Sequence, residues 1–142
     1  MEKIWFAEYQ KTGIPETVEL PSENTSLNDV FERNFQKFGS RDAFIFMDKV
    51  LTFSELDVAS RKFAAYLQSL GLPKGSRVAV MMPNVLQYPV VALAVFRAGF
   101  VLVNVNPLYT ARELEHQLND SGADVLVIIE NFASVYQAIL GK

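Results

Sequence analysis

Apolar residues in the first half of the chain recur at helical spacing in two segments. In the first segment, successive apolar positions are three or four residues apart, with one adjacent pair; they are Leu27, Val30, Phe31, Phe35 and Phe38. The second segment repeats this spacing with Leu56, Ala59, Phe63, Leu67 and Leu70. Such spacing places apolar side chains on one face of a helix. We therefore predict two amphipathic helices, the first ended by Gly39 and the second by Gly71.

Three expected helix starts carry a capping-box pattern. In this motif a Ser or Thr side chain and an acidic side chain three residues later each satisfy the other's backbone N–H. The pairs are Ser26 with Asp29, Thr52 with Glu55, and Thr110 with Glu113. The third pair begins a helix over residues 111–121, which Gly122 ends. We interpret residues 104–122 as a rigid crossover between two strands rather than as a catalytic segment.

The pattern changes to continuous apolar runs in the second half. These runs are Val78–Met82, Phe100–Val103 and Val125–Ile129. Strands that are apolar on both faces are typical of parallel sheets covered on each side by helices. Helical segments are expected at about 85–98, at 111–121 and from about Asn131. The resulting β-α-β-α-β-α order predicts an α/β fold with a parallel sheet and right-handed crossovers.

Two regions before this unit have their own patterns. Residues 43–47 and 50–52 are β-prone runs, which predict a hairpin with Asp48-Lys49 as its turn. Residues 1–25 contain two prolines and show no clear period, so we expect an extended lead-in. In the helix at 85–98, Pro89 falls just after the first turn, where it kinks the helix or delays its start. Asn84 is the candidate cap.

Composition narrows the classes of function. The 142 residues are 50% hydrophobic, and the net charge is −3, which gives no electrostatic reason to expect nucleic-acid binding. The chain has no cysteine and one histidine. Disulfides, thiolate catalysis and multi-histidine metal sites within one chain are therefore excluded. No secretory signal is visible at the N-terminus, so we expect a cytoplasmic protein.

A stretch without charge from Val78 to Phe96 has the hydropathy of a membrane span. Pro83, Asn84 and Pro89 interrupt it where a spanning helix would be continuous. We therefore expect two short buried elements there. The excess of apolar residues also implies that a sheet of three strands would leave its edges and part of one face bare. Either the unit dimerises or a longer chain continues past Lys142.

Several local patterns resemble catalytic or ligand-binding sites, and each has a simpler structural interpretation. Residues 71–76, GLPKGS, lack the order of a phosphate loop, because Lys74 precedes Gly75 and a helix precedes a strand. His116 lies near Glu113 and Asp120, but the helix register places it on a solvated face. Arg97 ends an apolar helix, and we expect it to extend to solvent or to meet the carbonyl terminus of that helix. Glu113 and Glu115 face different directions and form no glycosidase pair.

Three stretches together resemble the amino-terminal part of bacterial long-chain fatty acid–CoA ligases, which belong to the adenylate-forming superfamily. They are MMPNVLQYP from Met81, FRAG from Phe96, and VNVNPLYTARELEHQLNDSGA from Val103. The upstream LTFSELDVASRKFAAYLQSLGLPKGSRVAV is similar to the superfamily's opening of hairpin, helix, turn and strand. The similarity extends over essentially the whole chain and is weakest in the first 25 residues. Residues 26–142 would then form the first part of the large N-terminal domain.

The resemblance implies a two-step reaction in the parent enzyme. A fatty acid carboxylate attacks ATP to give an acyl-adenylate, with Mg²⁺ present, and the CoA thiol then displaces AMP. The Ser/Thr/Gly-rich loop with a Lys that stabilises phosphoryl oxygens in this family is absent from residues 1–142. We therefore assign no catalytic, cofactor-binding or metal-binding residue, and we expect this segment alone to be inactive and to bind none of these ligands.

The resemblance also implies partners. They are a long-chain fatty acid for the parent enzyme, the rest of its own chain, the inner membrane surface as a peripheral contact, and a second copy through exposed apolar surface. Two functional classes remain open at this point. The chain is either a structural segment of a ligase or a stand-alone α/β module that binds lipid or protein through its apolar face.

Overall fold

The computed structural model describes residues 3–18 and 25–141. Its elements are α1 (Phe6–Thr12), α2 (Leu27–Phe38), β1 (Asp42–Phe46), β2 (Lys49–Thr52), α3 (Phe53–Ser69), β3 (Arg77–Met81), α4 (Gln87–Ala98), β4 (Val101–Val105), α5 (Ala111–Ser121), β5 (Val125–Ile128), the 3₁₀ turn η1 (Glu130–Phe132) and α6 (Ala133–Gln137). The predicted order of elements from the first amphipathic helix onward is confirmed. No helix among the described residues has the length and hydropathy of a membrane span. The uncharged stretch from Val78 to Phe96 is divided between β3 and α4.

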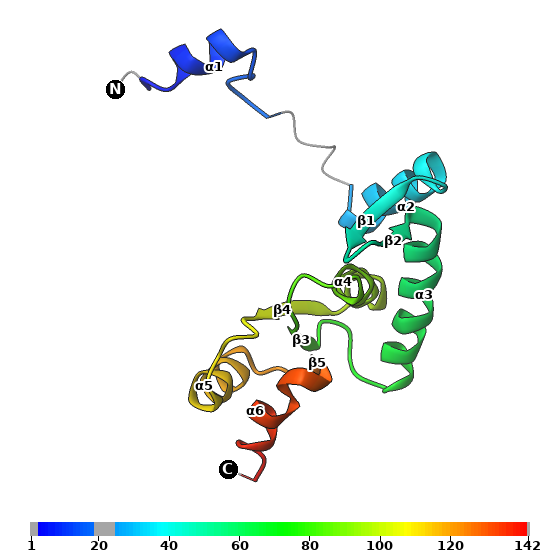
Figure 1. Cartoon of the computed structure of the whole chain (residues 1–142), viewed down its shortest axis with the longest axis vertical. Coiled ribbons are helices and arrows are strands. Elements are labelled where there is room, and N and C mark those ends of the chain that lie inside the picture. The colour runs from blue at the N-terminus through cyan, green and yellow to red at the C-terminus, as the bar shows by residue number, and fades with distance from the viewer. Residues whose placement is uncertain (1–2, 19–24, 142) are drawn as a thin grey trace.

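The main sheet has three parallel strands in the order β4-β3-β5. Figure 1 shows α4 between the sheet and α3, with α5 and α6 on the opposite side of the sheet. The four apolar residues of β3, Val78, Ala79, Val80 and Met81, are at most 1% exposed. β3 therefore forms the centre of the fold, and the helices form layers on both of its faces, as parallel strands require.

Alternate residues of β3 face different cores. Val78 and Val80 belong to a cluster with residues of α3 and α4, including Leu67 and Val95. Ala79 and Met81 belong to a second cluster with Leu114 of α5 and Val105 of β4. This alternation follows from the two-residue period of a strand. The outer edges of β4 and β5 have no strand partner among the described residues.

The hairpin is present, but its turn is one residue earlier than predicted. Phe46 pairs with Lys49, so Met47 and Asp48 form the two-residue loop instead of Asp48 and Lys49. Both loop residues have positive φ, 46° and 61°. Two-residue hairpin loops need this backbone conformation because its twist matches that of the strands. Methionine is an unusual residue there, which is why the sequence pattern placed the turn incorrectly.

The prediction of a wholly extended lead-in is wrong for seven residues. Residues 6–12 form α1, which buries no side chain and ends at Gly13 with φ 71°. In Figure 1, α1 lies apart from the other elements. A helix of about two turns without an apolar stripe against a core gives little periodic signal. Residues 19–24 of the lead-in lie outside the described part of the chain.

Two helix ends differ in detail from the sequence pattern. α4 begins at Gln87 rather than Val85, without a side-chain cap, so Asn84 does not have the predicted role. Pro89 then lies within the first turn, where its missing N–H has no helical acceptor, so the helix starts late. Gly39 ends α2 with φ −43°, not in a left-handed conformation. A Cβ at Gly39 would lie 2.7 Å from Ser54 Oγ, so the glycine permits close contact with α3.

All three predicted capping boxes are present. At α5 the backbone N–H of Thr110 donates to the Glu113 carboxylate at 2.8 Å, and Thr110 Oγ1 accepts from the Glu113 N–H at 3.4 Å. The corresponding bonds occur in the Ser26 and Thr52 boxes. Gly122 ends α5 in the left-handed conformation, with φ 59°. Residues 110–122 thus form the capped crossover helix that the sequence predicted.

Substitution Thr110→Ala is expected to lower the free energy of unfolding by about 1 kcal/mol, because one N–H at the start of α5 loses its acceptor. Urea denaturation followed by circular dichroism measures this change. Asn119→Ala, on the exposed side of the same helix, is the matched control and should cause no loss. Equal stability of wild type and Thr110→Ala would show that the cap contributes nothing.

The cap also predicts a dependence of stability on pH. Hydrogen bonds from the backbone N–H and then the hydroxyl of Thr110 hold the pKa of Glu113 below its ordinary value of 4.5. A carboxyl with a lower pKa in the folded state stabilises the protein above its unfolded pKa, and this contribution is lost as pH falls through the folded pKa. Glu113→Gln should therefore be less stable than wild type at pH 7, and the difference in urea midpoint should shrink towards pH 3. A difference that stays constant over this range would contradict the cap's role.

Candidate functional site

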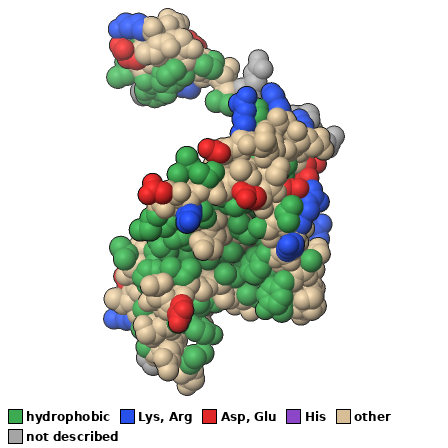
Figure 2. All heavy atoms as spheres, turned by 45° about the vertical axis from the view of Figure 1, so that its right-hand side comes forward, with side chains coloured by type: hydrophobic (Ala, Val, Ile, Leu, Met, Phe, Trp, Pro, Cys, Tyr) green, Lys and Arg blue, Asp and Glu red, His purple; other side chains and the backbone are tan. Residues whose placement is uncertain are grey.

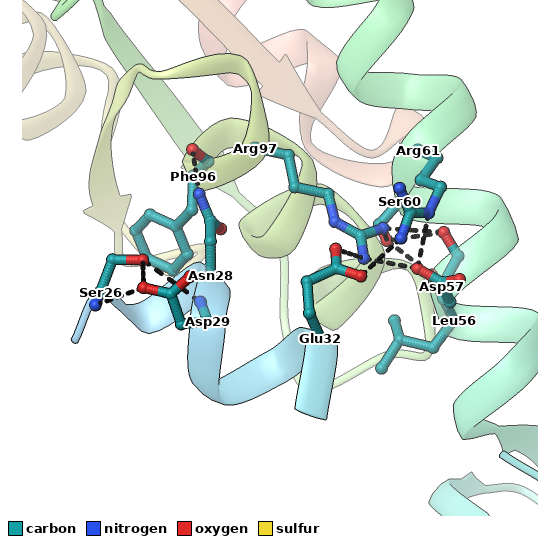
Figure 3. Close-up of polar contacts among 10 residues, drawn as sticks. All are labelled: Ser26, Asn28, Asp29, Glu32, Leu56, Asp57, Ser60, Arg61, Phe96 and Arg97. Atoms are coloured by element: carbon teal, nitrogen blue, oxygen red, sulfur yellow. Dashed lines mark hydrogen bonds and ion pairs between the residues drawn. The ribbon is translucent and has the colours of Figure 1, made fainter. Parts of the chain in front are cut away.

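The main polar cluster inside the described fold surrounds Arg97, at the end of α4. The Arg97 side chain is only 9% exposed. Its Nη2 donates to Glu32 Oε1 of α2 at 2.7 Å and to Asp57 Oδ1 of α3. Its Nη1 donates to the Asp57 carbonyl at 2.8 Å and to Ser60 Oγ at 2.6 Å. Figure 3 shows these residues converging from three helices on one guanidinium group.

A second arginine closes the cluster on its solvent side. Arg61 donates from Nε to Asp57 Oδ1 at 2.9 Å and from Nη2 to Glu32. The hydrogen bond to Asp57 is the main reason that the pKa of Arg61 is raised above its usual value. The guanidinium of Arg97 also lies 5.0 Å from the ring centroid of Phe35, at cation–π distance. Two positive and two negative side chains therefore balance one another.

The cluster provides structure rather than chemistry. Both carboxylates accept hydrogen bonds from arginines, so neither is free to act as a general base, and no cation remains to bind a phosphate. Without Arg97, the carboxylates of Glu32 and Asp57 would lose a positive partner between helices that pack through apolar side chains. The expectation that Arg97 extends to solvent or to its own helix terminus is wrong, because a buried guanidinium is stable only with carboxylate partners. The sequence did contain one sign of this polar cluster. Ser60 is polar, but it lies one helical turn from the apolar residues Leu56 and Ala64.

A wide pocket of about 660 Å³ lies along the exposed side of α5. Its lining residues are Tyr109, Thr110, Arg112, Glu113, His116 and Gln117. The Glu113 carboxylate is already bonded to the N–H and the hydroxyl of Thr110. His116 is exposed, which confirms the predicted solvated face. The pocket therefore contains no acid–base pair of the kind that catalysis requires.

A second pocket, of about 280 Å³, is apolar. We call it the aromatic groove, and its aromatic residues are Phe31, Phe35, Phe44, Phe53, Tyr88 and Phe96. They come from α2, the hairpin, the start of α3 and α4. None of the described residues that line the groove is charged. The groove can therefore hold an apolar group.

Two features bear on ATP and metal binding: the geometry of residues 71–76 and the distribution of possible metal ligands. Residues 71–76 form the predicted turn between α3 and β3, in which the N–H of Ser76 donates to the Pro73 carbonyl at 3.1 Å. No group of three or more metal-binding side chains occurs in the described part of the chain. The assignment of no catalytic, cofactor-binding or metal-binding residue to this chain stays a prediction.

Arg97→Met should lower the free energy of unfolding by about 2–3 kcal/mol. Loss of one partner from a fully buried ion pair costs about 3–5 kcal/mol, and here Asp57 and Glu32 are 25% and 37% exposed, which reduces the cost. Arg61→Met is the matched control, because Arg61 is 56% exposed and should cost less than about 1 kcal/mol. Urea denaturation of both variants gives the comparison. Equal losses of stability in the two variants would show that the burial of Arg97 does not determine the cost of removing it.

Comparison with known proteins shows the relationship of this chain. It is 50% identical, over all of its length, to a long-chain-fatty-acid–CoA ligase of Escherichia coli, of which it covers 25%. Among solved structures, it is similar to a benzoate CoA ligase of Burkholderia xenovorans, with TM-score 0.77 and 25% identity over 83% of this chain and 24% of that one. It is also similar to the N-terminal subdomain of Klebsiella oxytoca NpsA in complex with anthranilyl-AMSN, with TM-score 0.71 and 30% identity over 74% of this chain and 28% of that one.

These similarities confirm the expected fold class, in which a hairpin and helices precede a parallel α/β unit of an adenylate-forming N-terminal domain. The chain spans about a quarter of the length of the curated relatives that it matches. The model of the AMP-binding enzyme family matches residues 31–140, from α2 to the end of the described fold. The chain therefore belongs to the AMP-binding enzyme family.

Proposed function

We propose that this chain is the N-terminal structural segment of a ligase that activates long-chain fatty acids. In this proposal the parent enzyme converts the acid and ATP to an acyl-adenylate and pyrophosphate, then transfers the acyl group to CoA. The main support is the 50% identity to a long-chain-fatty-acid–CoA ligase across the entire chain. The segment's own role is to supply the first layers against which acyl and nucleotide pockets are built.

The geometry of the described residues supports a structural role. The arginines of the polar cluster are neutralised by carboxylates, the large pocket along α5 has no acid–base pair, and the aromatic groove is uncharged. We infer that ATP, Mg²⁺, CoA and the fatty acid all bind to residues of the parent enzyme outside this segment. We further infer that the parent is cytoplasmic, with a peripheral contact to the inner membrane.

The apolar surface of the segment supports the same proposal. Figure 2 shows hydrophobic side chains over a large part of one face, with charged side chains spaced around them. Contiguous apolar surface of this kind marks an interaction site on most proteins. A stand-alone binding module would also have such a surface. An experiment is therefore needed to distinguish a ligase segment from a binding module.

The first test is the complete reading frame. We expect a downstream run of Ser, Thr and Gly that ends in Lys, the loop that stabilises phosphoryl oxygens in adenylate-forming enzymes. A stop codon directly after Lys142 would contradict the proposal and favour the binding module.

The second test is enzymatic. The full-length protein, given ATP, Mg²⁺, CoA and oleate, should form oleoyl-CoA and AMP. Octanoate and benzoate, tested under the same conditions, should be poorer substrates. The 142-residue chain under the same conditions should form neither product, with omission of ATP as the blank. Acyl-CoA formed by the 142-residue chain would show that the chemistry lies within it, and benzoate preferred to oleate would contradict the long-chain assignment.

A further inference from the structure

A second apolar hollow adjoins the aromatic groove. Its volume is about 320 Å³, and its lining comes from β1, from the turn between β3 and α4, and from the start of α4. The two hollows share Phe44, Tyr88 and Pro89. Each is close in size to the lower end of the range for small-molecule sites, about 300–1,000 Å³. We call the two hollows together the extended groove.

The lining of the extended groove is formed before any ligand binds. Four of its residues are at most 9% exposed, and these are Phe35, Leu56, Ala92 and Leu93. The ring of Tyr88 is held in place because its hydroxyl donates to Asn104 Oδ1 of β4 at 2.8 Å. Apart from Tyr88, the only polar side chains in the described lining are the amides of Asn34 and Asn84. A preformed apolar hollow with a few polar groups is the usual form of a small-molecule site.

We propose that the extended groove binds one long, unbranched alkyl chain, at a site separate from the one where the parent enzyme activates its acid. This inference rests on the proposed function, which supplies fatty acids and their CoA thioesters as ligands of this class. The described lining contains neither a cation nor an acid–base pair. The acid that reacts therefore binds outside this segment, and the molecule in the groove is held rather than converted.

The shape and chemistry of the lining favour an alkyl chain over other apolar ligands. Two adjoining hollows form an elongated site, which a linear chain fills more completely than a single ring does. A polypeptide strand would bring backbone N–H and C=O groups that need partners, and the lining offers few. Each methylene group that leaves water adds to binding, so affinity should rise with chain length. The carboxylate or thioester end of the ligand stays in solvent.

Equilibrium dialysis of radiolabelled oleate and of oleoyl-CoA against the 142-residue chain tests the proposal. Both ligands should bind because they share the alkyl chain, and the tighter of the two identifies the source of that chain. Octanoate should bind at least about tenfold more weakly than oleate. Phe44→Asp places a charge on the wall that both hollows share, and it should weaken oleate binding by about tenfold or more.

Tyr66→Asp is the matched control for this substitution. Tyr66 is 56% exposed on α3 and Phe44 is 46% exposed on β1, and Tyr66 lines neither hollow. Both variants lose an exposed ring and gain a carboxylate, but Tyr66→Asp should bind oleate as the wild type does. Circular dichroism shows whether each variant folds.

A measurement on the unsubstituted parent keeps the test decisive if Phe44→Asp does not fold. A palmitate analogue with a diazirine on its alkyl chain would be irradiated with the full-length parent, and the labelled peptides would be mapped by mass spectrometry. We expect label within residues 31–56 and 84–96, in addition to any label downstream. Excess oleate should remove this label, because it competes for the same groove.

The outcomes separate this proposal from the assignment of function. Formation of oleoyl-CoA by the same parent preparation tests the ligase function. Equal oleate binding by the wild type and a folded Phe44→Asp variant would overturn the groove as the site. An active parent without label in residues 31–56 and 84–96 would show that other polypeptide fills the groove, which also overturns the proposal and leaves the ligase function standing. Label in these segments that oleate removes supports it.

Discussion

The fold depends on complete burial of one short strand. β3 contributes Val78, Ala79, Val80 and Met81, all at most 1% exposed, to two separate cores. A strand with apolar side chains on both faces needs a helical layer on each side and a strand on each edge. α4 with α3 provides one layer, α5 with α6 the other, and β4 and β5 occupy the edges (Figure 1). Fully burying an aliphatic side chain such as that of Val78 or Val80 contributes about 1.5–3 kcal/mol, so this strand is a large local source of stability.

The polar cluster around Arg97 fixes how the remaining helices join this core. α2 and α3 both pack on α4, and Arg97 connects the three helices through Glu32 and Asp57 (Figure 3). A buried ion pair is weak evidence for stability in itself, because desolvation offsets the attraction. Its geometry, with the guanidinium also satisfied by Ser60 Oγ, instead favours one arrangement of the helices over others. The cluster thus explains why an otherwise apolar helix retains a charge.

Local rules predicted the parts of the structure that local interactions decide. Capping boxes such as Thr110 with Glu113 and apolar runs such as Val78–Met82 located helices and strands because their signals lie within a few residues. The partners of Arg97 could not be predicted, since Glu32 and Asp57 lie 65 and 40 residues away in sequence. The hairpin turn was placed one residue late because Met47 occupies a positive-φ position that usually holds Asn, Asp or Gly. Cofactor residues were not assigned from sequence, and this assignment stays a prediction.

The segment therefore combines an α/β unit that is packed on both faces of β3 with a flanking hairpin that has exposed apolar side chains. Native-state hydrogen exchange of the 142-residue chain tests this difference most directly, because it measures the opening free energy of each amide. We expect the slowest exchange at β3 and α4 and much faster exchange at residues 43–51. If the amides of residues 43–51 exchange as slowly as those of β3, the hairpin needs no further polypeptide, and the view of this chain as an incomplete domain is wrong.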